Sequence, residues 1–155
     1  MNFVQKASGV LSNSRYQSPR GAAEGKSEKA LSRPRLSGSR VLVVEDEFII
    51  ALEIQSSLEE AGASVVGPAF SVSQALEFVL HEKLSAATLD LRLGRDSVAP
   101  IAKLLEERHI PFLLYTGQPS GDPVRRAWPD AKVLSKPASG SELVSAVADI
   151  LRTTH

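Results

Sequence analysis

Apolar residues follow two alternating patterns from residue 40 to the C-terminus. Short apolar runs, such as Val41–Val44 and Phe112–Leu114, have the length and composition of strands. The segments between such runs place apolar residues three or four positions apart, as amphipathic helices do. We expect strands at 40–45, 64–69, 85–90, 112–116 and 131–135, and helices at 48–61, after the N-cap Ser71, at 98–109 and at 139–152.

Glycine and proline refine two of these boundaries. Gly62 is placed to end the first helix, because glycine adopts the left-handed conformation common just after a helix. Residues 117–130 contain two Gly and three Pro, so any helix there must be short.

Five strand–helix units in about 115 residues indicate an α/β fold. Because such crossovers are right-handed, they give a parallel sheet with helices on both faces. Continuous apolar runs such as Val41–Val44 suit strands that are buried on both sides. We predict a flavodoxin-like, doubly wound, five-stranded sheet with strand order 2-1-3-4-5. The chain is too short for an eightfold barrel.

Residues 1–39 differ in composition from the rest of the chain. They contain eight Ser and seven basic against two acidic residues, with few large apolar side chains after residue 11. We predict a disordered extension over 1–39 and one domain over 40–155. Two alternatives stay open: a short amphipathic helix, since Phe3, Val4 and Leu11 share a helical face, or an organellar transit peptide.

Composition excludes several classes of function. The chain has no cysteine, which rules out disulfides, thiolate catalysis and cysteine-based zinc sites. No apolar run approaches the roughly 18 residues of a membrane span, and no secretory signal begins the chain, so we expect a cytoplasmic protein. Residues 40–155 carry eleven basic against sixteen acidic residues, which argues against direct nucleic-acid binding by the domain.

Polar residues follow four of the predicted strands at their carboxyl ends. They are Glu45 and Asp46, Asp90, Thr116 and Lys136. In an open parallel sheet these ends meet at one edge, where ligands bind. Three carboxylates, a hydroxyl and an ammonium can together hold a divalent cation and a phosphoryl group.

Each of these residues has a role in that chemistry and an ordinary alternative. Asp90 can act as a covalent phosphoryl acceptor, and Lys136 and Thr116 can contact phosphoryl oxygens, with Gly117 leaving the approach open. Alone, a strand-end Asp is often a helix cap and a Thr often a strand former. Their common order and placement favour the functional interpretation.

The arrangement resembles the receiver domain of bacterial two-component response regulators. The motifs that carry the resemblance are Val-Val-Glu45-Asp46-Glu, Thr-Leu-Asp90-Leu-Arg-Leu-Gly, Tyr-Thr116-Gly and Ser-Lys136-Pro137. The resemblance implies that Asp90 is the phosphoacceptor and that Mg²⁺ or Mn²⁺ is bound. It implies these further roles: Asp46 and Asp90 as metal ligands, Glu45 acting through water, the Arg92 backbone carbonyl on the metal, Thr116 and Lys136 on the phosphoryl group, and a cis Lys136–Pro137 bond.

The segment Pro111–Gly117 is similar to the Pro-Phe-x-Phe-x-Thr-Gly signature of a mainly alphaproteobacterial receiver subgroup. That similarity implies a stand-alone signalling module served by a histidine kinase, of the HWE class among others, or by a phosphotransfer protein. It also implies either a downstream protein partner or a role as a phosphate sink, and a monomer or weak homodimer. The module is not an enzyme beyond its own phosphotransfer and dephosphorylation.

One position departs from the family pattern. Val133 stands where many receivers have a switching aromatic residue, so we expect the signal to pass instead through 117–130, where Arg125, Arg126 and Trp128 are candidate partner contacts. Two other functions stay open. A degenerate receiver would bind a partner without phosphorylation, and an Asp-nucleophile phosphatase would need a second acid where the chain has Arg92.

Overall fold

A computed structural model describes residues 35–117 and 121–153 of the chain. Five parallel strands form the central sheet in the order β2-β1-β3-β6-β7. This is the predicted order 2-1-3-4-5 for the strands of the sheet, and the predicted flavodoxin-like fold is confirmed. The strands are β1 (Arg40–Val44), β2 (Ser64–Ala69), β3 (Ala86–Leu89), β6 (Phe112–Thr116) and β7 (Lys132–Ser135).

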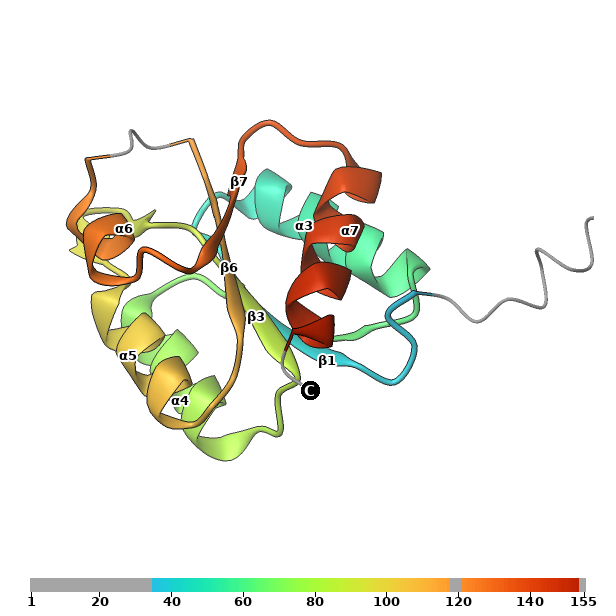
Figure 1. Ribbon diagram of the computed structural model, residues 1–155, viewed down its shortest axis with the longest axis horizontal. Coiled ribbons are helices and arrows are strands. Elements are labelled where there is room, and N and C mark those ends of the chain that lie inside the picture. The colour runs from blue at the N-terminus through green and yellow to red at the C-terminus, as the bar shows by residue number, and fades with distance from the viewer. Residues whose placement is uncertain (1–34, 118–120, 154–155) are drawn as a thin grey trace, which may run out of the picture. The chain divides into compact units, whose positions relative to one another are not determined.

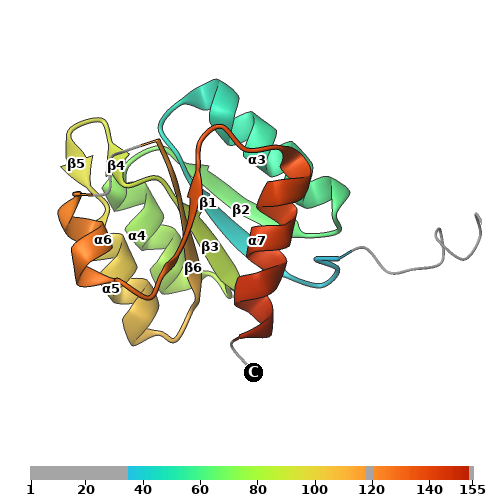
Figure 2. The same cartoon turned by 45° about the horizontal axis from the view of Figure 1, so that its top comes forward.

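Helices cover both faces of the sheet. Helices α3 (Phe48–Glu60) and α7 (Gly140–Arg152) lie side by side on one face (Figure 1). Helices α4 (Val72–His81) and α5 (Ala99–Glu107) cover the other face. The short helix α6 (Pro123–Ala127) lies near α5 (Figure 2), and its five residues agree with the expectation for the Gly/Pro-rich segment.

The core has two halves because side chains alternate across each strand. On β1, Leu42 and Val44 pack with α4 and α5, whereas Val41 and Val43 pack with α3 and α7. All four are essentially inaccessible to solvent. Burial of each such side chain contributes about 1.5–3 kcal/mol, which fixes the central strands and hence the residues at their ends.

Helix α3 ends in the way that Gly62 predicts. Gly62 has φ +98°, and its N–H donates to the Glu59 carbonyl at 2.9 Å. The next N–H, that of Ala63, donates to the Leu58 carbonyl at 3.0 Å. These two bonds form a Schellman motif, which satisfies carbonyls left open at the helix end.

A two-stranded ribbon that the sequence patterns do not predict follows Asp90. It pairs β4 (Arg92–Leu93) with β5 (Asp96–Ser97) in antiparallel register, around a turn that contains Gly94 at φ +62°. Two-residue strands are too short to show a period of two, so the pattern of apolar residues carries no sign of them. The ribbon lies beside α6 at one end of the sheet (Figure 2).

An irregularity in β2 sets the end of β1. The pairing of β1 with β2 shifts between Leu42 and Val44, opposite Gly67 and Pro68. Gly67 has φ +93°, and the Gly67–Pro68 bond is cis. The shift brings the Ala69 carbonyl to the N–H of Glu45, at 3.0 Å. Glu45 is therefore held at the carboxyl end of the sheet.

The described residues begin at Arg35, five positions before the predicted start of the domain at residue 40. Residues 1–34 of the predicted extension lie outside the described residues. Leu36, however, is completely buried in the α3–α7 half of the core, and its N–H donates to the Ala61 carbonyl at 2.8 Å. The sequence prediction missed Leu36 because one apolar residue among Ser, Arg and Pro shows no periodicity. In the described residues no helix is long and apolar enough to cross a membrane.

Candidate functional site

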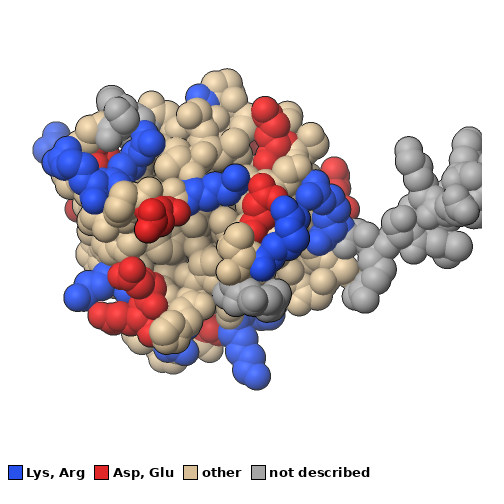
Figure 3. All heavy atoms as spheres, viewed as in Figure 1, with Lys and Arg blue, Asp and Glu red and all other residues tan. Residues whose placement is uncertain are grey.

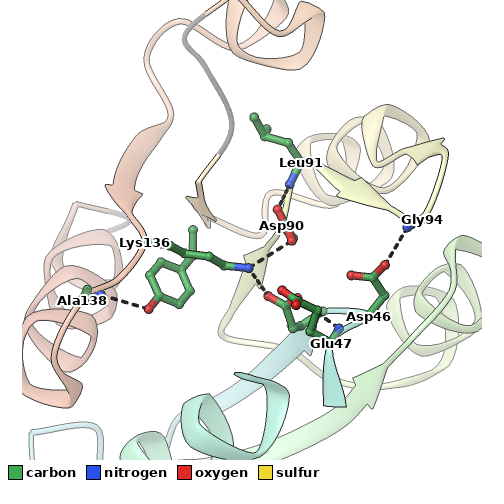
Figure 4. A network of polar contacts seen from close by, with 9 residues as sticks. Asp46, Glu47, Asp90, Leu91, Gly94, Lys136 and Ala138 are labelled. Carbon is green, nitrogen blue, oxygen red and sulfur yellow. Dashed lines mark hydrogen bonds and ion pairs between the residues drawn. The ribbon is translucent and has the colours of Figure 1, made fainter. Parts of the chain in front are cut away.

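The side chains at the ends of β1, β3 and β7 meet in one ion-pair network. Lys136 Nζ lies 2.7 Å from Glu45 Oε1 and 3.1 Å from Asp90 Oδ2 (Figure 4). These residues are far apart in the sequence and come from three different strand ends, as the predicted topology requires. Glu45 is 1% exposed, which separates this cluster from an ordinary group of surface charges.

Backbone groups hold the carboxylates in place. The N–H of Asp90 donates to the Val44 carbonyl at 3.1 Å, which ties the end of β3 to the end of β1. Asp90 Oδ1 accepts a bond from the Leu91 N–H at 2.7 Å. Glu45 Oε2 accepts one from the Glu47 N–H at 3.2 Å. Asp90 Oδ2 accepts a hydrogen bond from the Lys136 side chain and from none of these backbone groups, so it is the oxygen best placed to exchange partners.

Asp46 completes an acidic cluster that fits a divalent cation. One carboxylate oxygen from each of Glu45, Asp46 and Asp90 lies within 4.8 Å of the others. Asp46 Oδ2 accepts a hydrogen bond from the Gly94 N–H at 2.7 Å, so the β4–β5 turn orients it (Figure 4). Three carboxylates face one ammonium, and this excess of negative charge, offered by oxygen ligands, suits Mg²⁺.

Burial and the ion pair between them shift the pKa of Glu45 and of Lys136. Burial raises the pKa of Glu45; the hydrogen bond from Lys136 lowers it in part and the charge of Asp90 raises it further, so the pKa is above its ordinary value. For Lys136 burial lowers the pKa, but hydrogen bonds to Glu45 and Asp90 outweigh it, so the pKa is raised. Lys136 therefore stays protonated and positively charged. The negative charge of Asp90 makes it harder for the nearby Glu45 to lose its proton.

The other predicted site residues lie close by. Thr116 is buried at the end of β6, and its carbonyl accepts a bond from the Lys136 N–H at 3.0 Å. A Cβ placed on Gly117 would lie 3.9 Å from the Lys136 Cβ, so a side chain there would reach ordinary contact with the lysine. The Lys136–Pro137 bond is cis, as the resemblance implied. The expected metal contact of the Arg92 carbonyl stays a prediction.

An ion pair that the sequence patterns did not predict connects the described part of segment 117–130 to the loop after Asp90. Arg92 Nε lies 3.5 Å from Asp122 Oδ2, and Asp122 Oδ1 accepts a bond from the Val124 N–H at 2.8 Å. Asp122 is thus the N-cap of α6. Its position immediately before Pro123 is a typical helix-start signal that could have been read from the sequence.

Trp128 packs edge-on against Phe112, with ring centres 6.3 Å apart. It lines an open cavity of about 850 Å³ at the opposite end of β6 from Thr116. The residues that line it do not include those of the acidic cluster. The predicted partner contacts of Trp128, Arg125 and Arg126 stay predictions.

Basic and acidic side chains are interspersed on the face of the molecule shown in Figure 3. Basic side chains also gather at the upper left of this face.

Comparisons with known proteins identify the family. No protein-family model and no curated protein matches the chain. Among solved structures, SdrG from Sphingomonas melonis Fr1 is 36% identical, with a TM-score of 0.65 over 76% of this chain and 98% of that chain. A response regulator receiver protein from Sinorhizobium medicae WSM419 is 23% identical, with a TM-score of 0.66 over 76% and 97%. The response regulator PhyR from Brucella abortus is 23% identical, with a TM-score of 0.64 over 85% and 56%.

The two structures at 23% identity show the fold, and the relationship to SdrG extends over nearly all of that protein. The acidic cluster of Glu45, Asp46 and Asp90 is consistent with the phosphorylation site of a receiver domain. The chain belongs to the response regulator receiver family.

Proposed function

We propose that this protein receives a phosphoryl group on Asp90 and changes conformation in response. The observation that supports the proposal most strongly is the position of Lys136, whose ammonium bridges Asp90 Oδ2 and the buried Glu45. A cation at that point lies beside the attacking oxygen and can follow the phosphoryl group once it is attached. A kinase or phosphotransfer protein that carries phosphohistidine would be the donor.

The transfer is a nucleophilic displacement at phosphorus. Asp90 Oδ2 forms the new O–P bond as the P–N bond to the donor imidazole breaks. The electron pair of the broken bond stays on the imidazole nitrogen, so no oxidant, reductant or water takes part. The product is a mixed anhydride on Asp90, which is open to later hydrolysis.

Charge repulsion between the phosphoryl group and three carboxylates opposes this step. Glu45, Asp46 and Asp90 would hold Mg²⁺ or Mn²⁺, which supplies the positive charge that offsets this repulsion. Lys136 supplies a second positive charge, and the Thr116 hydroxyl can donate to a phosphoryl oxygen. When the Lys136 ammonium turns to the phosphoryl group, it leaves Glu45, and the buried Glu45 carboxylate loses its ion-pair partner. Phosphorylation of Asp90 would therefore change the environment of Glu45.

The output would pass through the β6–α6 connection rather than through an aromatic switch at position 133. Val133 packs with the α4–α5 half of the core, and the Arg92–Asp122 pair links the loop after Asp90 to α6. The residues Pro111–Gly117 are the basis for proposing that the chain belongs to the Pro-Phe-x-Phe-x-Thr-Gly subgroup. A downstream protein partner would then recognise the rearranged surface.

Incubation with acetyl phosphate and Mg²⁺, followed by intact-mass measurement, tests the proposal. The wild type should gain the mass of one phosphoryl group, and Asp90→Asn should gain none. Omission of Mg²⁺ with a chelator present should abolish the adduct. A wild type that acetyl phosphate and phosphorylated histidine kinases leave unmodified would instead support a phosphorylation-independent binding module. Continuous release of phosphate from phosphomonoesters would support the phosphatase alternative, which Arg92 disfavours.

A further inference from the structure

Tyr115 contacts the Lys136 segment at two points. Its hydroxyl accepts a hydrogen bond from the Ala138 N–H at 3.3 Å (Figure 4). Lys136 Nζ lies 5.6 Å from the centre of the Tyr115 ring, within the range of a cation–π interaction. On the other side of the lysine, its own N–H donates to the Thr116 carbonyl at 3.0 Å. Two neighbouring residues of β6 therefore contact Lys136: Tyr115 contacts its side chain and Thr116 its backbone.

The position of the Tyr115 ring is set by the core and not by the lysine. The residue is 8% exposed and belongs to the buried cluster between the sheet, α3 and α7, together with Val43 and Leu143. Helix α7 is itself fixed close by, because its N-cap Ser139 forms a capping box with Glu142. The ring is thus a rigid surface beside a long and otherwise flexible side chain.

The ring and the carboxylates hold the ammonium in different ways. Contacts from Lys136 to Glu45 and Asp90 depend on the charge and position of each carboxylate, and these change when Asp90 is phosphorylated. The attraction of an ammonium to an aromatic face does not depend on either carboxylate. A contact that survives the change of partner keeps the lysine from swinging into solvent during that change.

We propose that Tyr115 is a positioning residue, which holds the Lys136 ammonium within reach of the oxygen on Asp90 before and after phosphoryl transfer. The inference rests on the proposed function. It is distinct from the aromatic switch that many receivers have three residues before the lysine. That position, Val133, packs in the α4–α5 half of the core, whereas Tyr115 packs in the opposite half.

Three substitutions separate the ring from the hydroxyl and from general packing. Tyr115→Leu removes both contacts with Lys136, and Tyr115→Phe keeps the ring face and removes only the hydroxyl. Phe112→Leu is the matched control, since it removes an aromatic residue from the same strand that contacts Trp128 and not the lysine. Urea unfolding of each variant confirms that the protein compared is folded.

The measurements are the rate of phosphorylation by acetyl phosphate and the lifetime of the phosphorylated form. Lys136→Met defines which of the two depends on the lysine. We expect Tyr115→Leu to change the same quantity in the same direction, by roughly three- to thirtyfold, with Tyr115→Phe within about threefold of wild type. Phe112→Leu should match wild type. In the Lys136→Met background, Tyr115→Leu should add nothing, because it acts through the lysine.

Two outcomes would overturn the inference. One is a Tyr115→Leu protein with wild-type rate and lifetime, and the other is an equal effect of Tyr115→Leu with and without the lysine. Failure of the proposed function is recognised separately. It would show as a wild type that takes no phosphoryl group, or as a Lys136→Met variant in which neither quantity changes.

Discussion

Arg92 on β4 forms an ion pair with Asp122 at the start of α6, with 3.5 Å between Nε and Oδ2. The Asp122 side chain is 7% exposed, whereas Arg92 is 40% exposed. The pair therefore joins the loop that follows Asp90 to the start of the short helix α6. Asp122 acts twice in this contact, as an ion-pair partner and as a helix cap.

Asp122→Ala should destabilise the protein by about 1–2 kcal/mol, because it removes the cap as well as the ion pair. Asp122→Asn keeps an oxygen that can cap and should cost less than about 1 kcal/mol. Equilibrium urea unfolding measures both. Asp130→Ala, which changes an exposed acid in the turn after α6, is the control. Equal costs for the Asn and Ala variants would show that the cap contributes nothing.

Gly67 is required by the shape of the β1–β2 connection. A Cβ on Gly67 would lie 2.8 Å from the Ala69 nitrogen and 3.1 Å from the Val43 carbonyl oxygen, both backbone atoms of the sheet. Gly67→Ala should therefore cost at least about 2 kcal/mol in unfolding free energy, and should also weaken the hold on Glu45.

Gly38→Ala is the matched control for this prediction. Gly38 also has a positive φ, +84°, but a Cβ there would meet nothing within 4 Å. Its cost should be limited to the conformational term of about 1–2 kcal/mol. Similar losses in the two variants would show that the backbone contacts at Gly67 relax without penalty.

Glu45 should make the metal-free protein less stable as pH rises above 4.5, the ordinary pKa of a glutamate. Burial, partly offset by Lys136, raises the pKa of Glu45 above 4.5 in the folded state. Between the unfolded-state pKa of Glu45 and its higher folded-state pKa, the folded protein binds more protons than the unfolded chain. The free energy of unfolding therefore falls as pH rises through this window.

Urea unfolding across that window, with a chelator present, measures this effect as a difference from Glu45→Gln. The wild type should lose more stability with rising pH than the variant. Glu47→Gln removes a neighbouring exposed carboxylate and should keep the wild-type slope. Parallel curves for wild type and Glu45→Gln would contradict the prediction.

Mg²⁺ should stabilise the folded protein through the acidic cluster. A ligand that binds only the folded state at a concentration of 100 times its Kd adds about 2.7 kcal/mol to the free energy of unfolding. The stabilisation should disappear in Asp46→Asn, because Asp46 contributes one of the three clustered carboxylates. Asp96→Asn, which changes an exposed acid on β5 outside the cluster, should keep it. Equal Mg²⁺ responses in the two variants would place the ion elsewhere.

Much of the fold could be predicted because strands buried on both faces give continuous apolar runs, such as that of β1. The candidate site could be located because parallel strands carry their end residues to one edge, which brings together Glu45, Asp90 and Lys136. The β4–β5 ribbon could not be predicted, because two-residue strands are too short to show alternating apolar and polar residues. The hydrogen bond from Gly94 to Asp46 could not be predicted either, because it depends on the ribbon.

The contacts of Tyr115 were missed for a different reason. In the sequence Tyr115 is one residue of an apolar strand, and its role depends on which face of the sheet it occupies relative to the Lys136 loop. That relationship arises only from the register of β6 with β7, where Tyr115 pairs with Leu134. Leu36 was missed similarly, since its burial follows from α3 and α7 packing together.

The most direct test of the central claim is the chemical location of the phosphoryl group. After treatment with acetyl phosphate and Mg²⁺, borohydride reduction converts an aspartyl phosphate to homoserine, and peptide mass spectrometry then identifies the residue. We predict homoserine at position 90 of the wild type, and none in Asp90→Asn or in wild type treated without Mg²⁺. A modified residue elsewhere, or no modified residue in a wild type that is folded and binds Mg²⁺, would contradict the assignment of Asp90 as the phosphoacceptor.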